Sequence, residues 1–414
     1  MLHSSLKYFI NNGTNSNINV SGEIYMLHET STMGNYVASV QEISELKQFE
    51  NFYKPIHGYL AACVCVFGVL ANILNIVVLT RKNMLTSTNV ILTGLAISDG
   101  LTMALYFPWA LGMYIINGVE ARPSRDTYQL AQFQMAYAIM SVIVHSVSIW
   151  LTVTLAVFRY VFIRFPRRGV RLCNIERAKT ACGIVVAAVL FVCLPNSLTY
   201  EIVGEWYNVT LTDGTYVNGT VYWVDVKSAT GFWEVFKNLN FWIQAIFIKL
   251  LPCFLLTVFS LLLLKTMRDA EKRRKRLLNK VPLSDGESGA LSSGSNTGKK
   301  IKKTSRSNRT TRMLLTVVFM FIITNTPQGI LSVLSGLIDE FFHNVYMPLG
   351  DLLDIMTLLN NGINFVLYCT MSKQFRETFI KIFVKNSMGA NNGVRKTTTY
   401  ITAQDTQATR DSDV

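Results

Sequence analysis

The sequence is short of charge, and it lacks the cysteine pattern of a secreted or zinc-binding protein. Only 16% of its 414 residues are charged, whereas a soluble domain usually carries about 25%. Of its seven cysteines, Cys173 lies in a basic stretch and the others lie within or at the ends of apolar runs. No spacing matches a zinc site or a disulfide framework, so we expect mostly or wholly free thiols.

The sequence also lacks the motifs of common enzymes and transporters. It has no phosphate-binding loop, zinc motif or nucleophile elbow. Asp99 is the only carboxylate deep within an apolar run, and no second acid or set of metal ligands lies beside it. We see no internal repeat of the kind that secondary transporters carry. The chain is therefore predicted not to be an enzyme and to need no cofactor.

Apolar residues, in contrast, make up half of the chain and gather into long runs. About 20 such residues span a bilayer as a helix. Seven runs meet that length: Pro55–Thr80, Thr88–Ile116, Tyr128–Ile163, Ala178–Tyr200, Asn240–Thr266, Met313–Ile338 and Tyr346–Met371. Beyond them, Phe375, Phe379, Ile380 and Phe383 share one face of a short segment, as in helices that lie on a membrane surface. We predict an all-α membrane protein, a seven-transmembrane helix bundle with a short amphipathic C-terminal helix.

Charge and glycosylation signals agree on one orientation. The formal net charge of +13 is clustered between particular runs, as in Lys272–Arg276. Basic clusters can bind nucleic acid, but here they fit the positive bias of cytoplasmic loops, so we predict no nucleic-acid partner. Glycosylation sequons lie in the opposite segments, at Asn12, Asn19, Asn208 and Asn218. We predict a multi-pass plasma-membrane protein with an extracellular N-terminus. A fifth sequon, at Asn308, would then lie inside and stay unused.

The runs divide the chain into four parts. Residues 1–54 are predicted to be a disordered extracellular tail, 55–371 the membrane domain, 372–384 the amphipathic surface helix and 385–414 a disordered cytoplasmic tail. The first ten residues lack the features of a signal peptide, so the first helix should direct insertion. Within the membrane domain, the inner loop 267–311 is basic with a Ser- and Gly-rich middle, and it is predicted to be flexible.

Polar residues inside the apolar runs are costly and need a reason. They include Asp99 in the second run, Asn72 in the first, Ser148 in the third, and Asn360 and Asn364 in the seventh. Unrelated hydrogen bonds between helices, each worth about 1 kcal/mol or less, would explain the neutral groups. A lone Asp needs several polar partners, a cation or a proton.

Motifs on five of the runs resemble the rhodopsin-like G-protein-coupled receptor family. They are Leu95-Ala96 with Asp99, Phe158-Arg159-Tyr160 followed by Pro166, Pro252, Pro327, and Asn364 to Tyr368. Each is weak alone, but five in order on separate helices are a specific signal. The resemblance covers about Pro55 to Val384. Thr324–Leu331 and Ile363–Ser372 are further similar to the myosuppressin receptors and FMRFamide-type relatives of invertebrates.

The resemblance implies roles for these residues and partners for the chain. A sodium-linked polar cluster would stabilise the inactive state, formed by Asn72, Asp99, Ser148, Asn360 and Asn364. Arg159 and Tyr160 would meet a heterotrimeric G protein of the inhibitory class, and Tyr368 would stabilise the active arrangement. The ligand would be a short extracellular neuropeptide ending in Arg-Phe-amide, and arrestin and receptor kinases would be further partners. A receptor for another ligand class, or a seven-helix transporter, is the alternative.

Several departures from the family pattern carry information. Phe158 replaces the acid that usually pairs with the arginine, Phe365 replaces a proline, and Asn325 stands where a tryptophan is common. The seventh run contains no lysine, and an opsin would need one for its Schiff base.

The usual disulfide of the family cannot form in this chain. Gln134 occupies the cysteine position at the top of the third helix, and the second outer loop has no cysteine. That loop must fold by packing, and we predict a hairpin from Glu205–Val209 and Tyr216–Val224. Its signal is Asp213-Gly214 between aromatic and β-branched residues.

The candidate ligand site combines carboxylates with aromatic rings. Asp351 and Asp354 lie three residues apart and can face inward on one helical turn. Tyr106, Trp109 and Tyr137 lie near the tops of the second and third helices. Carboxylates suit a guanidinium and aromatic rings suit a phenyl ring. The alternatives are carboxylates that merely solvate a helix end and aromatic residues that form an interfacial belt.

Further polar groups lie beside this site in the sequence. We add Gln244 and Gln328 to the predicted ligand-binding residues, and His145 and Lys249 are intramembrane ionisable groups. Lys249 either connects the pocket to the sixth helix near Asn325 or extends its ammonium towards the interface.

The cytoplasmic side offers contacts of lower specificity. The basic clusters Lys272–Arg276 and Lys299–Arg312 would bind anionic lipid or flank the G-protein pocket, or both. Thr397–Thr399 suits receptor kinases. The end of the chain, Ser412–Val414, fits a motif that PDZ domains read by strand addition.

Overall fold

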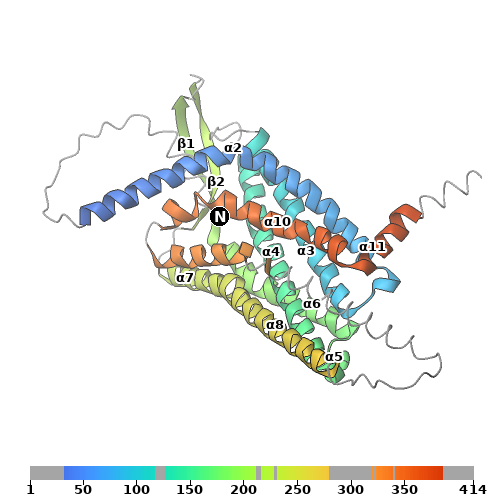
Figure 1. Cartoon of the computed structure of the whole chain (residues 1–414). Coiled ribbons are helices and arrows are strands. Elements are labelled where there is room, and N and C mark those ends of the chain that lie inside the picture. Colours follow the sequence, from blue (N-terminus) through green and yellow to red (C-terminus); the bar gives the residue numbers. More distant parts are fainter. Residues whose placement is uncertain are drawn as a thin grey trace, which may run out of the picture.

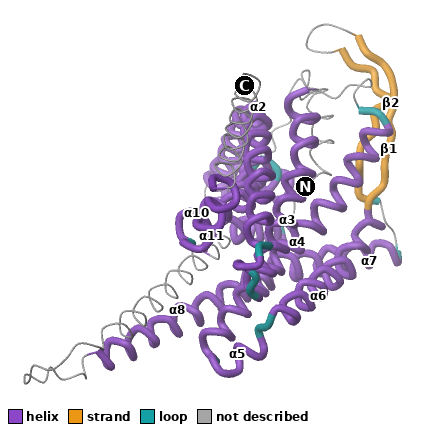
Figure 2. Tube along the Cα trace, turned by 90° about the vertical axis from the view of Figure 1, so that its right-hand side faces the viewer, coloured by secondary structure: helices purple, strands orange, loops and turns teal. Residues whose placement is uncertain are grey.

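Long apolar helices lying side by side form the described part of the chain (Figures 1 and 2). The computed structural model describes residues 32–116, 126–210, 216–227, 231–278, 319–320, 323–338 and 341–385. Within these ranges, six helices are long and apolar enough to cross a membrane. The other predicted run, Met313–Ile338, is described only in part, and residues 319–320 and 323–337 of it are helical; we call them the sixth helix. Helices suit a bilayer because they satisfy every backbone polar group internally.

The elements follow the predicted runs closely. In order they are α2 (Thr32–Leu79), η1 (Lys82–Met84), α3 (Ser87–Ala110), η2 (Leu111–Ile116), α4 (Tyr128–Arg164), α5 (Pro166–Leu172), α6 (Ile175–Cys193), η3 (Leu194–Thr199), β1 (Tyr200–Thr210), β2 (Tyr216–Val226), α7 (Phe232–Gln244), η4 (Ala245–Leu250), α8 (Leu251–Leu278), η5 (Phe342–Tyr346), α10 (Gly350–Met371), α11 (Lys373–Ile380) and η6 (Lys381–Lys385). The last two elements match the predicted amphipathic helix 372–384.

The first helix corrects the prediction of a disordered tail over residues 1–54. Helix α2 already begins at Thr32 and passes through Pro55. Its early turns make contacts that a disordered chain would lack: the rings of Phe49 and Tyr53 stack at 5.6 Å, and Lys54 pairs with Glu50 at 3.4 Å. Residues 1–31 lie outside the described residues.

The inner loop is also shorter than predicted. Helix α8 continues to Leu278, so residues 267–278 of the predicted flexible loop 267–311 are helical. The basic residues in this segment extend the helix because long charged side chains have good helix propensity. The rest of that loop, and the predicted tail from residue 386, lie outside the described residues.

Helix α4 occupies the centre of the described bundle. It contacts α3, α6 and α8, while α2 contacts α3 and α10. Buried apolar clusters fill these interfaces, one of them joining Leu92, Leu155 and Tyr368. Large apolar side chains on the outside, such as Phe191 on α6, are exposed, as expected where the solvent is lipid hydrocarbon.

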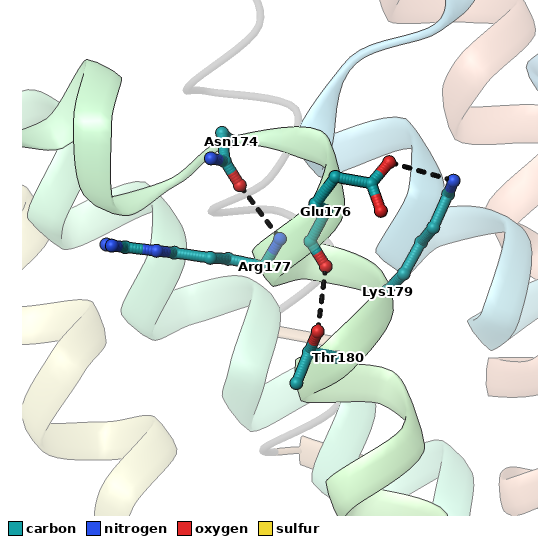
Figure 3. Close-up of polar contacts among 5 residues, drawn as sticks. All are labelled: Asn174, Glu176, Arg177, Lys179 and Thr180. Carbon is teal, nitrogen blue, oxygen red and sulfur yellow. Dashed lines mark hydrogen bonds and ion pairs between the residues drawn. The ribbon is translucent and has the colours of Figure 1, made fainter.

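Polar residues fix the point at which α6 begins (Figure 3). The backbone N–H of Arg177 donates to Asn174 Oδ1 at 2.8 Å, which caps the first turn. The hydroxyl of Thr180 donates to the Glu176 carbonyl at 3.0 Å. Lys179 Nζ pairs with Glu176 Oε1 at 3.1 Å on the exposed surface. The helix therefore begins at a fixed place, two residues after Cys173, whose thiol pKa is raised by burial.

The predicted hairpin is confirmed. Strands β1 and β2 pair antiparallel from Tyr200↔Val226 to Thr210↔Tyr216, while the turn at Asp213-Gly214 lies outside the described residues. The N–H of Tyr222 donates to the Asp126 carbonyl at 2.9 Å, and the N–H of Lys227 donates to the Thr199 carbonyl at 2.9 Å.

Packing holds the hairpin in place without a covalent bond. Trp223 is 3% exposed and lies in a small apolar cluster with Val221, against which Met113 of η2 packs. All seven cysteines are free, as predicted. Gln134, at the position of the missing cysteine, is buried and its Nε2 lies 3.6 Å from Met113 Sδ.

The two ends of the bundle differ in structure. Figure 1 places the hairpin at one end and α5 and α11 at the other. At the α11 end, Asn83 of the first short connection donates from Nδ2 to Thr378 Oγ1 at 2.8 Å. Gln374 Nε2 in turn donates to the Asn83 carbonyl at 2.8 Å. This arrangement fixes α11 against the ends of the long helices.

Candidate functional site

At the hairpin end of the bundle, a chain of hydrogen bonds joins three helices and ends on Asp354. The Tyr106 hydroxyl donates to Asp354 Oδ2 at 3.5 Å. Its oxygen therefore accepts from His57 Nε2, which lies 2.8 Å away. The second ring nitrogen, Nδ1, lies 3.4 Å from the Tyr53 hydroxyl and accepts from it in the neutral ring. The donor and acceptor in each of these hydrogen bonds are set by Asp354, because its carboxylate can only accept.

The second carboxylate has its own tyrosine. Tyr114 of η2 donates to Asp351 Oδ1 at 2.7 Å. The ring of Tyr114 also lies 5.0 Å from that of His57, so both carboxylates share one neighbourhood. We call His57, Tyr106, Tyr114, Asp351 and Asp354 the acidic cluster. Two carboxylates that each accept from a phenol favour a cationic partner, because phenol hydrogen bonds leave their charges unneutralised.

Aromatic rings form a wall beside the acidic cluster. Trp109 and Tyr137 stack with centroids 4.9 Å apart and planes 4° from parallel. Tyr106 meets Tyr137 edge to face at 6.3 Å. Tyr106 is thus shared between wall and cluster. The structure brings together five of the predicted ligand-binding residues here: Tyr106, Trp109, Tyr137, Asp351 and Asp354.

The two predicted glutamines lie in different surroundings. Gln328 of the sixth helix is buried and accepts from Lys249 Nζ at 2.8 Å, and Lys249 also interacts electrostatically with Asp354. The sequence placed Lys249 near Asn325, one turn away. Gln244 instead donates to the Val192 carbonyl of α6 at 2.9 Å. Both ring nitrogens of His145 are buried and have no hydrogen-bond partner among the described residues.

Deeper in the bundle, Asp99 joins three helices. Its Oδ1 accepts from the Ser148 hydroxyl at 2.5 Å, and its Oδ2 accepts from Asn364 Nδ2 at 3.0 Å. Asn72 Nδ2 donates nearby to the Asn361 carbonyl at 3.1 Å. The structure therefore brings together Asp99, Ser148 and Asn364 of the predicted cluster, and it adds Asn361 as the partner of Asn72.

Asn360 stands apart from this group. It has no hydrogen bond to Asp99 or to any other described residue, and it lines a cavity between α2, the sixth helix and α10. Asn361 and Asn364 are buried whereas Asn360 is only half-buried. The core face of α10 runs between Asn361 and Asn364, which leaves Asn360 at its border. The structure therefore does not join Asn360 to Asp99 by a hydrogen bond, and its place in the polar cluster stays a prediction.

The predicted G-protein residues lie at the α11 end. Arg159 is half-buried, and its Nε has no hydrogen-bond partner within the described ranges. Tyr160 lies against Phe259 of α8 at 5.9 Å. Tyr368 is buried against Phe375 of α11 at 5.6 Å. Within the described part of the chain Arg159 forms no ion pair, and Phe158 stands where the family usually has the pairing acid.

The remaining predicted sites fall mostly outside the described residues. These are Asn12, Asn19, Asn308, Thr397–Thr399 and Ser412–Val414. Asn208 and Asn218 face each other in the hairpin register, and the Asn218 side chain is exposed.

Sequence reasoning missed His57 and Tyr114. A signal for His57 was present, since an ionisable group in an apolar run is a candidate functional residue by default. Tyr114 carried no such signal, because its role depends on a carboxylate 237 positions away.

Comparison with known proteins places this geometry in context. A family model described as serpentine-type 7TM GPCR chemoreceptor Srw matches residues 59–386. The G-protein coupled receptor dmsr-1 of Caenorhabditis elegans is 35% identical over 81% of this chain and 69% of its own length. The sex peptide receptor of Drosophila melanogaster is 29% identical, over 83% of this chain and 75% of its own. The FMRFamide receptor of the same fly is 22% identical, over 80% of this chain and 54% of its own.

Proposed function

Because the chain belongs to the serpentine-type Srw family of seven-helix G-protein-coupled receptors, we propose that it binds a short amidated neuropeptide ending in Arg-Phe and signals through inhibitory G proteins. Membership makes the chain a membrane receptor and not an enzyme, and its relatives include receptors named for peptides. The ligand and the G protein are the parts that the proposal adds.

The observation that carries the proposal is Asp354 beside the aromatic wall. Its carboxylate suits a guanidinium, which binds such groups through charge-assisted hydrogen bonds. The stacked pair Trp109 and Tyr137 offers a face for the phenyl ring. Asp351 and Asp354 place two acidic side chains in one neighbourhood, which suits a ligand with a cationic side chain at this position.

The polar core and the residues at the α11 end would couple ligand binding to G-protein activation. Asp99 with Ser148 and Asn364 offers oxygen ligands of the kind that hard cations prefer, so these residues would hold a sodium ion in the inactive state. A ligand shifts such an equilibrium only if it binds one packing better than the other. In the active state, Arg159 and Tyr160 would contact the G protein, and Tyr368 would stabilise that arrangement of the helices.

Other partners follow from the sequence alone. Receptor kinases and arrestin would act on the Ser- and Thr-containing tail, a PDZ domain would read Ser412–Val414, and anionic lipid would contact the basic end of α8. The N-terminus and the hairpin would face outward at the plasma membrane.

The test is a G-protein activation assay in cells with amidated peptides. An Arg-Phe-amide peptide should activate the receptor, and Asp354→Asn should raise its half-maximal concentration about 10- to 100-fold, because a hydrogen bond to a charged group is worth about 1.5–3 kcal/mol. Glu176→Gln is the matched control. It also removes a carboxylate, but one in an exposed pair, where the loss should be small.

Surface expression of each variant is measured by antibody labelling. A peptide whose arginine is replaced by neutral citrulline should have the same half-maximal concentration on the wild-type receptor and on Asp354→Asn. An unchanged dose response in Asp354→Asn at equal surface expression, or activation only by peptides without arginine, would contradict the proposed ligand class.

A further inference from the structure

Two large aromatic side chains of the hairpin lie outside the bundle. Trp206 of β1 and Tyr216 of β2 are each 65% exposed, while Val221 and Trp223 of β2 are buried. The strands extend beyond the long helices at that end of the molecule (Figures 1 and 2). Exposed apolar groups that gather on one surface often mark an interaction site, so the two rings need a partner.

Both rings share a face of the sheet with the glycosylation sequon at Asn218. Side chains two apart on a strand point to the same face, so Tyr216 and Thr220 lie on either side of Asn218, each about 7 Å along the strand. Thr220 pairs with Trp206 across the sheet. Trp206 is therefore a diagonal neighbour of Asn218, and such neighbours lie about 7–8 Å apart, within reach of aromatic side chains.

The exposed Asn218 side chain can carry the group that these rings lack. The first sugar of an N-linked glycan is a pyranose whose faces are lined by C–H groups. These groups are weakly positive, and an aromatic ring presents a negative face, so a sugar packs flat on an aromatic ring. A group that is tethered beside its binding surface also has a high effective concentration there.

Other occupants of this face fit less well. An acyl chain would have to leave the bilayer, because the hairpin extends past the ends of the long helices (Figure 1). A protein that covered both rings would meet the glycan, since Asn218 stands between Tyr216 and Trp206 on that face. The sugar attached to Asn218 is already in place and needs no further partner.

We propose that the N-linked glycan of Asn218 lies flat on the hairpin, with its first sugars stacked on Tyr216 and Trp206. The stacking gives the glycan a fixed direction over β1 and β2, and it covers two rings that water would otherwise surround. Val221 and Trp223 hold the hairpin on the bundle separately, so docking of the hairpin does not depend on the glycan. The inference rests on the proposed outward orientation of the hairpin, because only an outward segment meets the glycosylation enzymes.

The test is hydroxyl-radical footprinting of the full-length receptor in nanodiscs, made in animal cells that add only high-mannose glycans. The background substitution Asn208→Gln leaves Asn218 as the one sequon of the hairpin. Thr220→Ala destroys that sequon. Mass spectrometry should then find the oxidation of Trp206 and Tyr216 raised about 2- to 13-fold, the ratio that a ring contact of about 0.5–1.5 kcal/mol supports. Thr220→Ser keeps the sequon and should leave both rings protected.

A long glycan also shields nearby rings simply by moving over them, and trimming separates the two cases. An endoglycosidase that leaves a single N-acetylglucosamine on Asn218 removes the moving part. If the sugars stack, the remaining one keeps at least one of the two rings protected. If they only shield, both rings become as reactive as in Thr220→Ala.

The reciprocal experiment removes the rings and follows the glycan. Trp206→Ala combined with Tyr216→Ala should let peptide N-glycosidase release the glycan from folded receptor about 2- to 13-fold faster. Trp206→Phe combined with Tyr216→Phe keeps two rings and should keep most of the slow release. Trp233→Ala, which removes a tryptophan of α7 that is 51% exposed, should leave the release unchanged. Surface expression and peptide activation check the fold of each variant.

Three outcomes would overturn the stacking. They are equal oxidation of both rings with and without the glycan, loss of all protection once one sugar remains, and glycan release that ignores the removal of both rings. A receptor without any sugar at Asn218 would overturn the outward orientation as well. A glycosylated receptor with unprotected rings would leave that orientation intact, so the two failures are distinguishable.

Discussion

At the scale of single residues, His57 has a larger role than its place near the start of an apolar run suggests. It is fully buried and donates to Tyr106 at 2.8 Å, and Tyr106 donates to Asp354. The imidazole thereby fixes the direction of the tyrosine proton. In the proposed site His57 would be a positioning residue, which acts on the ligand through Tyr106 and Asp354 without touching it.

The substitution His57→Phe keeps a ring and removes the hydrogen bond. We expect the half-maximal concentration of an Arg-Phe-amide peptide to rise about 5- to 160-fold, because an unpartnered buried group costs about 1–3 kcal/mol. The effect should shrink for the citrulline peptide, in which the charge that Asp354 recognises is absent. A merely structural role would weaken both peptides equally, and dose-response curves of both in each receptor distinguish the cases.

The residues that the sequence could identify are those with a local anomaly. Asp99, Ser148 and Asn364 stand out because each is polar within an apolar run, and the structure places them in contact. Asn360 has the same local signal but faces a cavity. Helical periodicity cannot decide this, because Asn360 lies at the border of the core face and packing sets the final direction.

At the scale of elements, the hairpin replaces a missing covalent bond with packing. Trp223 on its inner side is almost fully buried, whereas Trp206 on the same sheet is 65% exposed. Two backbone hydrogen bonds, at Tyr222 and Lys227, complete the attachment. The hairpin itself could be predicted from its turn residues, but its contacts with Asp126 and Met113 could not, because they join distant parts of the chain.

Truncation of the two tryptophans should therefore have unequal effects. Trp223→Ala should destabilise the docked hairpin by about 3–5 kcal/mol, the usual cost of removing a buried large aromatic. Hydrogen exchange of the β1 and β2 amides should then rise sharply, while Trp206→Ala should leave exchange nearly unchanged. Equal exchange in both variants would mean that the backbone hydrogen bonds alone hold the hairpin.

At the scale of the whole molecule, the long apolar runs made the helix bundle predictable. The positions at which the helices end were harder to predict. Six of the seven predicted runs coincide with described helices that could cross a membrane. The ends moved at Thr32 and at Leu278, where helices continue past the apolar stretch into polar sequence. Hydropathy marks the lipid-covered part of a helix and not its last hydrogen bond.

The orientation of the bundle gives a further prediction. Asn218 is exposed in the hairpin, so its sequon should carry a glycan if that end faces outward. Asn218→Gln should remove one glycan from receptor made in animal cells, seen as a mobility shift that glycosidase abolishes. Asn308→Gln should change nothing. A glycan at Asn308 with none at Asn218 would show that the bundle has the opposite orientation in the membrane.

The absence of any covalent clamp on the hairpin has a practical consequence for synthesis of the receptor. Its folding needs no disulfide formation, since every cysteine is a free thiol and strands β1 and β2 dock through apolar packing and two backbone hydrogen bonds. Cell-free translation into nanodiscs, with reductant present throughout, is therefore suited to this chain and would also spare its thiols from scrambling.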